Sequence, residues 1–385
     1  MPVSDRIKRP PAEGSGASRR LERLVRPELR ALTPYTVSDA SGMVKLDAME
    51  NPHLWPDDMR AEWLTLLDGT HVNRYPDPEA AELKAHIRRA EGLSDNQALV
   101  LGNGSDELIQ LLALVFARPG AAVLSVTPTF VMYRRSAIAA GMAYLEVPLD
   151  VDSFALSGRA MLAAIERYQP SLIFLAYPNN PTGNLFDTDA VAAVARAAEG
   201  LVVIDEAYAP FAGDTWLARC REFDNVVVMR TLSKLGLAGL RLGFLLGAPA
   251  WIDQLEKLRL PYNINVLTQG TAAFALEKID VLRRQTEAIC RQREALTAAL
   301  ARIEGLRVWP SRANFLLFRS SSVGAQSIFD GLKQRKVLIK NLDGTAPALK
   351  NCLRVTIGTA VENAAFLAAL EQTLAHNADN ARQPG

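Results

Sequence analysis

Short apolar runs alternate with longer amphipathic segments through the first two thirds of the chain. Runs rich in valine, isoleucine and leucine predict strands at residues 99–101, 123–126, 143–147, 172–176, 201–204, 226–229 and 243–246. Apolar residues at helical spacing between most of these runs predict helices at residues 79–91, 108–116, 133–140, 159–168 and 190–198. Short strands separated by helices are typical of a mostly parallel sheet covered on both faces, so the predicted fold class is α/β.

A second, smaller alternating pattern follows residue 265. It predicts helices at residues 267–277, 281–303, 326–333 and up to about 374, and strands at residues 306–309, 314–318, 337–339 and 353–357. This pattern indicates a smaller C-terminal α/β domain. At the other end, residues 1–20 are rich in proline, glycine, serine and arginine, and Pro27 interrupts the segment that follows. We expect residues 1–31 to form a disordered N-terminal arm.

Polar motifs follow five of the predicted strands where each strand ends. Residues 102–105, 127–130 and 179–183 follow three strands, Asp205 ends a fourth, and Lys234 follows a fifth within a few residues. In a parallel sheet the carboxyl ends of the strands lie along one edge, and ligands bind there. The sequence therefore predicts a single crevice that these motifs share.

Lys234 is the residue of this set with the most distinctive chemistry. It lies among small and apolar residues, and loss of solvation lowers the pKa of a lysine, so that its amine can form a Schiff base with an aldehyde. The nearby hydroxyls of Thr231 and Ser233 and the guanidinium of Arg241 suit a phosphate. An aldehyde and a phosphate together suggest pyridoxal 5′-phosphate. An exposed loop lysine is the commoner explanation of such a stretch, and the rest of the chain has to decide.

Asp205 extends the same chemistry to a second strand end. A carboxylate at the end of an apolar strand is costly to bury unless it meets a cation, and the protonated nitrogen of a pyridine ring is such a cation. The phenol of Tyr208 and the amide of Asn180 could hydrogen-bond the ring oxygen. Each of these residues also has an ordinary explanation, as a helix cap, a core tyrosine or a turn residue. Their occurrence in order on successive strand ends favours the cofactor site.

Composition excludes several classes of partner. The formal net charge of the 385 residues is +1, and no basic helix carries interleaved aromatic residues, so no nucleic acid is expected to bind. Three widely spaced cysteines argue against disulfides and a zinc cluster, and no metal site is expected. The apolar runs are too short to span a membrane, and the N-terminus lacks the apolar region of a secretory signal, so we expect a cytoplasmic protein.

In combination these motifs resemble those of the fold-type I pyridoxal-phosphate aminotransferases. The likeness covers about residues 32–374 and is greatest to members that act on histidinol phosphate. The motifs that carry it are Leu32-Thr33-Pro34-Tyr35, Glu50-Asn51-Pro52, Arg74-Tyr75-Pro76, Gly104-Ser105-Asp106-Glu107, Pro128-Thr129-Phe130, Asn179-Asn180-Pro181-Thr182-Gly183, Asp205-Glu206-Ala207-Tyr208, Thr231-Leu232-Ser233-Lys234, Ala313-Asn314-Phe315 and Leu353-Arg354-Val355-Thr356.

The resemblance implies roles for the residues around the cofactor ring. Lys234 would hold pyridoxal phosphate as a Schiff base and would then be the base that moves the substrate proton. Asp205 would keep the pyridine nitrogen protonated, while Asn180 and Tyr208 would hold the phenolic oxygen. Phe130, where relatives often have tyrosine, would stack on the ring face.

The resemblance also implies a phosphate site and a second subunit. The cofactor phosphate would be bound by the amides of Ser105, Asp106 and Glu107, the hydroxyls of Thr231 and Ser233, the guanidinium of Arg241, and Tyr75 of a second copy. The protein would therefore be a homodimer with a composite site. Arg241 follows Lys234 by seven positions, whereas some relatives have a spacing of eight, so the loop after Lys234 is one residue shorter here.

For the substrates, the resemblance implies transamination between histidinol phosphate and 2-oxoglutarate in histidine biosynthesis. Arg354, beside Asn180, would bind the α-carboxylate of glutamate or 2-oxoglutarate. Tyr35 and Lys340 would contact the phosphate of histidinol phosphate or imidazole-acetol phosphate. Many relatives have arginine where Lys340 stands, and lysine offers a point charge without the two-pronged geometry.

The same resemblance implies a domain division and leaves rival functions open. Residues 32–72 would form an N-terminal arm and part of the small domain, residues 73–265 the large cofactor-binding domain, and residues 266–385 the interdomain helices and small domain. An aromatic or broad-specificity aminotransferase is one alternative, and a phosphothreonine-type decarboxylase is another. A ligand-binding half of a transcription regulator would need a DNA-binding domain, and no helix-turn-helix precedes residue 32.

Overall fold

In the computed structural model, residues 16–94 and 97–382 are described, and they divide into two compact units with a boundary between Asp39 and Ala40. The first unit contains α1 (Gly16–Leu24) and α2 (Pro27–Arg30), and neither helix has a buried residue. These two helices lie within the N-terminal arm predicted for residues 1–31, which remains a prediction, and the first 15 residues of that arm lie outside the described ones. Pro27 begins α2, because proline is well suited to the first position of a helix.

The second unit contains a seven-stranded sheet, here called the large sheet. Its strands are β2 (Ala98–Gly102), β3 (Ala122–Thr127), β4 (Ala143–Pro148), β5 (Leu172–Ala176), β6 (Leu201–Asp205), β7 (Val226–Thr231) and β8 (Gly243–Gly247), in the order β2-β8-β7-β6-β5-β3-β4. All pairs are parallel except those of β8, which runs antiparallel to β2 and β7. The loop from β7 to β8 has no crossover helix, which a parallel connection needs. The predicted α/β class is confirmed.

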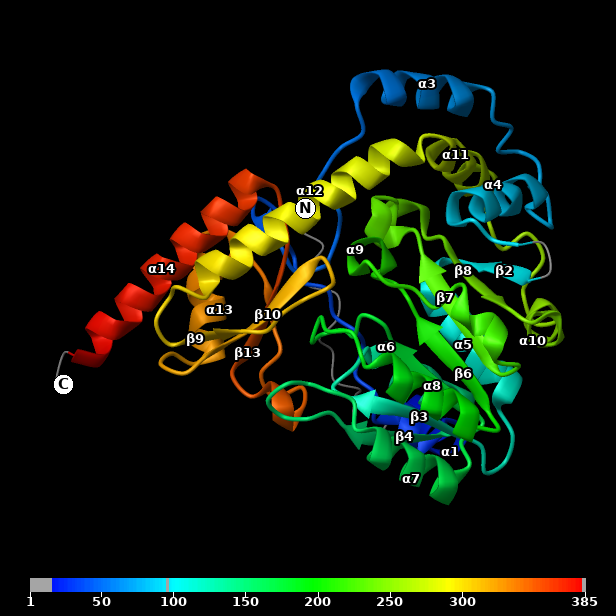
Figure 1. Ribbon diagram of the computed structural model, residues 1–385, viewed down its shortest axis with the longest axis horizontal. Helices are drawn as coiled ribbons and strands as arrows, with labels where there is room; N and C mark the ends of the chain where they lie inside the picture. The colour runs from blue at the N-terminus through cyan, green and yellow to red at the C-terminus, as the bar shows by residue number, and fades with distance from the viewer. Residues whose placement is uncertain (1–15, 95–96, 383–385) are drawn as a thin grey trace. The chain divides into compact units, whose positions relative to one another are not determined.

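Helices cover both faces of the large sheet (Figure 1). One face shares a core with α5 (Gly104–Phe116), α6 (Val131–Ala140) and α10 (Pro249–Glu256). The other shares a core with α4 (Ala81–Glu91), α7 (Gly158–Tyr168), α8 (Thr188–Ala197) and α11 (Val266–Glu277). Neighbouring strand residues such as Val203 and Ile204 belong to opposite cores because side chains alternate along a strand.

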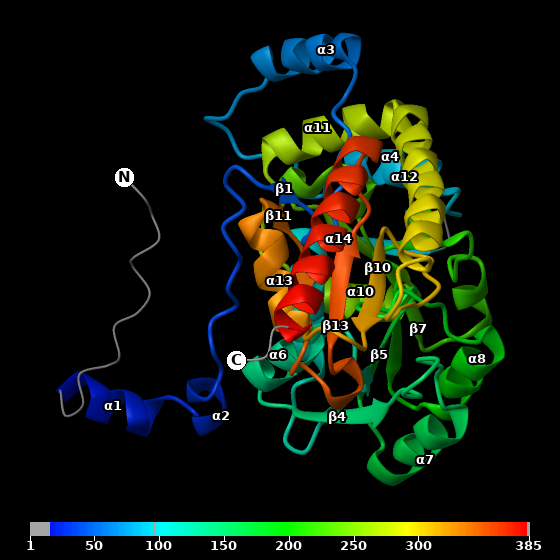
Figure 2. The ribbon, with the colours of Figure 1, turned by 90° about the vertical axis from the view of Figure 1, so that its left-hand side faces the viewer.

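The C-terminal part forms a four-stranded antiparallel sheet, here called the small sheet. It contains β9 (Leu306–Val308), β10 (Phe315–Ser320), β12 (Lys340–Asn341) and β13 (Cys352–Thr356), in the order β12-β13-β10-β9. Helices α12 (Ile279–Leu300), α13 (Ala325–Gln334) and α14 (Ala360–Arg382) pack against this sheet or against one another (Figure 2). A short strand, β1 (Val44–Lys45), pairs with β11 (Val337–Leu338) and so joins residues 44–45 to this part. The predicted domain boundaries at residues 32, 73 and 266 remain a proposal.

Three helical segments differ from the sequence predictions. Helix α3 (Asp57–Asp68) was not predicted, and it buries only Met59, so its apolar pattern is weak. The four-residue α9 (Ala209–Ala212) was also not predicted. Helix α5 begins at Gly104, whereas the prediction began it at residue 108. The prediction was late because the first turn of the helix consists of small and acidic residues outside the apolar run. None of the helices in the described ranges is long and apolar enough to cross a membrane.

Candidate active site

A cavity opens at the edge of the large sheet where the parallel strands end. Its lining comes mainly from the loops after β2, β3, β5, β6 and β7, as the sequence predicted for a shared crevice. The lining residues are Met49, Ser105, Asp106, Phe130, Ala176, Asn180, Asp205, Ala207, Tyr208, Thr231, Ser233, Lys234 and Arg241. The structure therefore brings together all the predicted cofactor-binding residues except Glu107 and Tyr75.

Lys234 reaches this cavity from the short helical turn η2 (Ser233–Leu235), just after β7. Its half-buried Nζ donates a hydrogen bond to the carbonyl oxygen of Ala48, 3.2 Å away. Desolvation, followed by the positive charge of Arg354, lowers the pKa of Lys234 to about 8. A lysine with this pKa is partly neutral near pH 7 and can act as a nucleophile or a base.

Asp205 ends β6 and is buried at the cavity wall. The Tyr133 hydroxyl donates to its Oδ2 at 2.6 Å, and the Ala207 backbone N–H donates to its Oδ1 at 3.0 Å. Burial raises the pKa of Asp205 to about 6, and both hydrogen bonds oppose this rise. The negative charges of Asp106 and Glu206 raise the pKa further, so the site favours a cation beside Asp205.

A chain of hydrogen bonds connects Asn180 and Tyr208 of the cavity lining to Arg354, which lies outside that lining. The Asn180 Nδ2 donates to the Tyr208 hydroxyl at 3.1 Å, and the Arg354 guanidinium donates to Asn180 Oδ1 at 2.5 Å. Arg354 comes from β13 of the small sheet and is buried, with its second Nη donating to the Asp47 carbonyl oxygen at 3.0 Å. The amide of Asn180 thus fixes a phenol on one side and a cation on the other.

The start of α5 forms an anion cradle. Backbone N–H groups in the first turn of a helix have no partner within the helix, and Ser105 and Asp106 lie in that turn. The Arg241 guanidinium lies beside it, 3.2 Å from Asp106 Oδ2. Gly104 has φ +76°, a conformation that side-chain-bearing residues rarely adopt, and a Cβ there would lie 2.9 Å from an Nη of Arg241, so glycine is favoured at this position. Thr231 donates to the Ser233 hydroxyl at 2.9 Å on the opposite loop.

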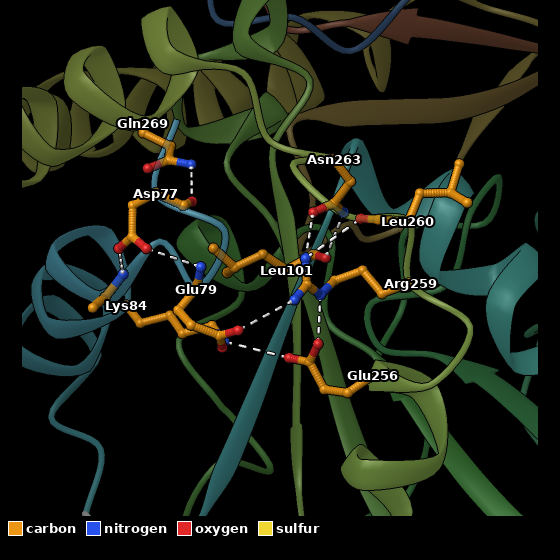
Figure 3. Close-up of polar contacts among 10 residues, drawn as sticks. Asp77, Glu79, Lys84, Leu101, Glu256, Arg259, Leu260, Asn263 and Gln269 are labelled. Atoms are coloured by element: carbon orange, nitrogen blue, oxygen red, sulfur yellow. Dashed lines mark hydrogen bonds and ion pairs between the residues drawn. The ribbon is translucent and has the colours of Figure 1, made fainter. Parts of the chain in front are cut away.

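A polar network behind the cradle holds the start of α5 in place. Asn263 Nδ2 donates to the Leu101 carbonyl oxygen at 3.1 Å and to the Glu107 carboxylate at 3.2 Å. Arg259 pairs with Glu256 and donates to Asn263 Oδ1 at 3.1 Å (Figure 3). The Glu107 carboxylate is thereby engaged outside the cavity lining, so only the backbone of Glu107 is available for an anion.

The remaining predicted residues occupy different places. Lys340 on β12 is directly opposite Arg354 on β13, and opposite residues of an antiparallel pair have side chains on the same face. Tyr75 is 81% exposed and stacks on Tyr262 with ring centroids 4.4 Å apart, outside the cavity lining. Tyr35 belongs to the first unit.

Sequence reasoning missed a segment and a side chain. Three consecutive residues accept hydrogen bonds from predicted site residues: Asp47 from Arg354, Ala48 from Lys234, and the Met49 sulfur from Tyr208 at 3.3 Å. Two of these acceptors are backbone carbonyls, which have no sequence signature. The missed side chain is Tyr133. Its position three residues after Phe130 on a helix was the available signal, because such residues share a helix face.

The donor set fits pyridoxal 5′-phosphate group by group. Lys234 suits the aldehyde, Asp205 the ring nitrogen, Asn180 with Tyr208 the phenolic oxygen, and the cradle at α5 the phosphate. A metal fits less well, because no group of three or more histidine, cysteine, aspartate or glutamate residues in the described ranges could hold one.

Comparison with known proteins agrees with this chemistry. Residues 41–370 match the family "Aminotransferase class I and II". A Nitrosococcus oceani protein named histidinol-phosphate aminotransferase 2 is 51% identical over 91% of this chain and 98% of its own length. A Chromobacterium violaceum histidinol-phosphate aminotransferase is 49% identical, with the same coverage. The crystal structure of the Sinorhizobium meliloti histidinol-phosphate aminotransferase in complex with pyridoxal 5′-phosphate has a TM-score of 0.81 and 26% identity, covering 91% of this chain and 97% of its own.

Proposed function

This chain belongs to the class I and II aminotransferases, a pyridoxal-phosphate-dependent family, and from that premise we propose that histidinol phosphate is its substrate. The reaction moves an amino group between glutamate and imidazole-acetol phosphate, giving 2-oxoglutarate and histidinol phosphate, as a step of histidine biosynthesis. The observation that carries the chemistry is Lys234, desolvated in a cavity that it shares with Asp205. Names of relatives near 50% identity support the substrate. The cytoplasmic location remains a prediction.

Lys234 has two tasks at this site. It would hold the cofactor through Nζ, and as a free amine it would take the proton from the amino-bearing carbon of the substrate. A pKa of about 8 keeps enough of this amine neutral for both tasks. When bound, pyridoxal phosphate supplies an electron-accepting ring that stabilises the charge left on that carbon.

The other residues of the cavity would bind and orient the cofactor. Asp205 would face the ring nitrogen and keep a proton there, while Tyr208 and Asn180 would hold the phenolic oxygen. Phe130 would pack on the ring face without adding a hydroxyl. The start of α5 would hold the phosphate, and Arg241, now paired with Asp106, would be available to it as a cation.

Two cations on one face of the small sheet support an acidic substrate. Arg354 is buried and suits the carboxylate of glutamate or 2-oxoglutarate, with Asn180 beside it. Lys340, directly opposite on β12, suits the phosphate of histidinol phosphate. Tyr35 is proposed to contact the same phosphate. Because Lys340 is a point charge, an aromatic or broad-specificity aminotransferase is the second candidate.

The rate at which single substrates convert the holoprotein to its amino form tests the substrate. We expect histidinol phosphate to react about 100-fold faster than phenylalanine or tyrosine, because its phosphate would pair with the Lys340 ammonium and these amino acids carry no phosphate. Stopped-flow absorbance measures each rate. Equal rates would indicate the broad-specificity enzyme, and release of CO₂ from phosphothreonine would indicate the decarboxylase.

Arg354→Ala supplies the control for that assay. It is expected to slow the glutamate reaction about 100-fold, since a buried charge pair with the carboxylate is lost. The reaction of histidinol phosphate, which has no carboxylate, should slow much less. An equal loss with both substrates would mean that Arg354 does not distinguish them.

We also propose a homodimer in which Tyr75 completes the phosphate site of the partner. Its support is that Tyr75 is exposed and lies outside its own cavity lining. Mixing Lys234→Ala and Tyr75→Ala chains should restore up to about a quarter of the wild-type activity, because half of the dimers would be mixed and each would have one intact site. No recovery after subunit exchange, or a monomer by light scattering, would contradict the composite site.

A further inference from the structure

Tyr133 lies between two groups of the proposed cofactor site. It is the third residue of α6 and is fully buried. Its ring stacks on Phe174 with centroids 4.5 Å apart and meets the ring of Phe130 edge-on at 5.6 Å. Its hydroxyl donates to Asp205 Oδ2 at 2.6 Å. One side chain thus contacts both the residue that would stack on the cofactor ring and the residue that would face its nitrogen.

Packing alone does not explain why residue 133 carries a buried hydroxyl. A phenylalanine would make the same stack on Phe174, and a buried hydroxyl is unfavourable unless it is hydrogen-bonded. Burial and the negative charge of Asp205 hold the pKa of Tyr133 well above its usual value, so the phenol keeps its proton. Tyr133 is therefore a permanent donor to one carboxylate.

The two hydrogen bonds to Asp205 restrict how its carboxylate can turn. Tyr133 donates to Oδ2 and the Ala207 N–H donates to Oδ1, so each oxygen has its own donor. Donors to different oxygens fix rotation about the Cβ–Cγ bond. A donor to a carboxylate also stabilises the charged form against burial, and charge-assisted bonds of this kind are the stronger ones.

We propose that Tyr133 is a positioning residue that acts through Asp205: its hydroxyl keeps that carboxylate ionised and aimed at the ring nitrogen of the cofactor. The aromatic ring of Tyr133 also packs edge-to-face with Phe130 and would thereby support Phe130 against the face of the cofactor ring. This inference rests on the proposed cofactor site. It predicts that the Tyr133 hydroxyl matters only when the cofactor ring contains a nitrogen for Asp205 to meet.

The test is the dissociation constant of two cofactors from the apoprotein of Tyr133→Phe. One is pyridoxal phosphate, and the other is its analogue with C–H in place of the ring nitrogen. Tyr133→Phe should bind pyridoxal phosphate about 10-fold more weakly than wild type, because a hydrogen bond to a charged group is lost, and should bind the analogue within about 2-fold of wild type. Tyr133→4-aminophenylalanine has a similar shape and a weaker donor, so its dissociation constant for pyridoxal phosphate should lie between those of wild type and Tyr133→Phe. This variant also keeps a donor to Asp205, so it can be measured if Tyr133→Phe folds poorly.

Tyr177→Phe is the matched control. Tyr177 is also buried, and its hydroxyl donates to the carboxylate of Asp214 at 2.7 Å, but neither residue lines the cavity. It should leave both dissociation constants unchanged. If Tyr133→Phe loses affinity equally for both cofactors, or for neither, Tyr133 is a packing residue and the inference is wrong. If wild type binds no pyridoxal phosphate at all, the proposed function itself fails, which is a different outcome.

Discussion

Lys234→Ala is expected to lower the rate of the glutamate half-reaction by about 10⁴-fold. The variant loses the proposed covalent anchor, which is also the only lysine in the cavity lining that could move the proton. The desolvation that brings the pKa of Lys234 to about 8 is what suits it to this role. Single-turnover absorbance spectra measure the rate.

Lys278→Ala is a suitable control for this variant. Lys278 is a partly exposed lysine that pairs with Glu62 at 2.6 Å, so its loss removes a charge but no cavity group. It should leave the rate unchanged. Added methylamine should restore part of the activity of Lys234→Ala, because a small free amine can occupy the space and accept the proton. Full activity of Lys234→Ala without any added amine would overturn the assigned role.

Asp205→Asn is expected to lower the turnover number by about 10³-fold, with weaker binding of pyridoxal phosphate. The asparagine keeps the shape but removes the charge that would hold a proton on the ring nitrogen. Because burial raises the pKa of Asp205 to about 6 when no cation faces it, the apoprotein should gain stability as the pH falls from about 6 toward 4. In this window the folded carboxyl binds a proton that the unfolded chain does not. Asp205→Asn should lose this pH dependence.

Asp214→Asn tests whether removing the charge from any tyrosine–aspartate pair would lower turnover and cofactor affinity. Asp214 accepts a hydrogen bond from Tyr177, but it lies outside the cavity lining, and hydrogen bonds hold its pKa below the usual value despite partial burial. It should leave turnover and cofactor affinity unchanged. Turnover of Asp205→Asn within about 10-fold of wild type would show that another group protonates the ring.

Residues on strand ends were the most predictable part of the site. Asp205 ends β6, and Asn180 and Lys234 follow β5 and β7. Because parallel neighbours must end at the same edge, sequence order alone implied the proximity of these residues. Boundaries that depend on apolar runs were less predictable. The first turn of α5 was assigned to a loop because Gly104 to Glu107 are small or acidic, although such residues are favoured at a helix start.

Contacts made by packing and by the backbone could not be predicted. Tyr133 resembles any apolar-face residue of α6, and only the fold shows that its hydroxyl meets Asp205. The carbonyl oxygens of Asp47 and Ala48 are acceptors in every sequence. The direction of Arg241 depended on two short turns and on its own left-handed backbone, with φ +50°, which together bring it to the start of α5.

Borohydride reduction of the holoprotein, followed by peptide mass spectrometry, identifies directly the residue that binds the cofactor. Reduction makes the bond between the lysine and pyridoxal phosphate permanent, so the cofactor mass stays on one peptide. We expect that mass on Lys234 alone, and its disappearance from the Lys234→Ala variant. Cofactor mass on a different lysine, or a protein that transaminates while Lys234 stays unlabelled, would contradict the assignment of Lys234 as the covalent anchor.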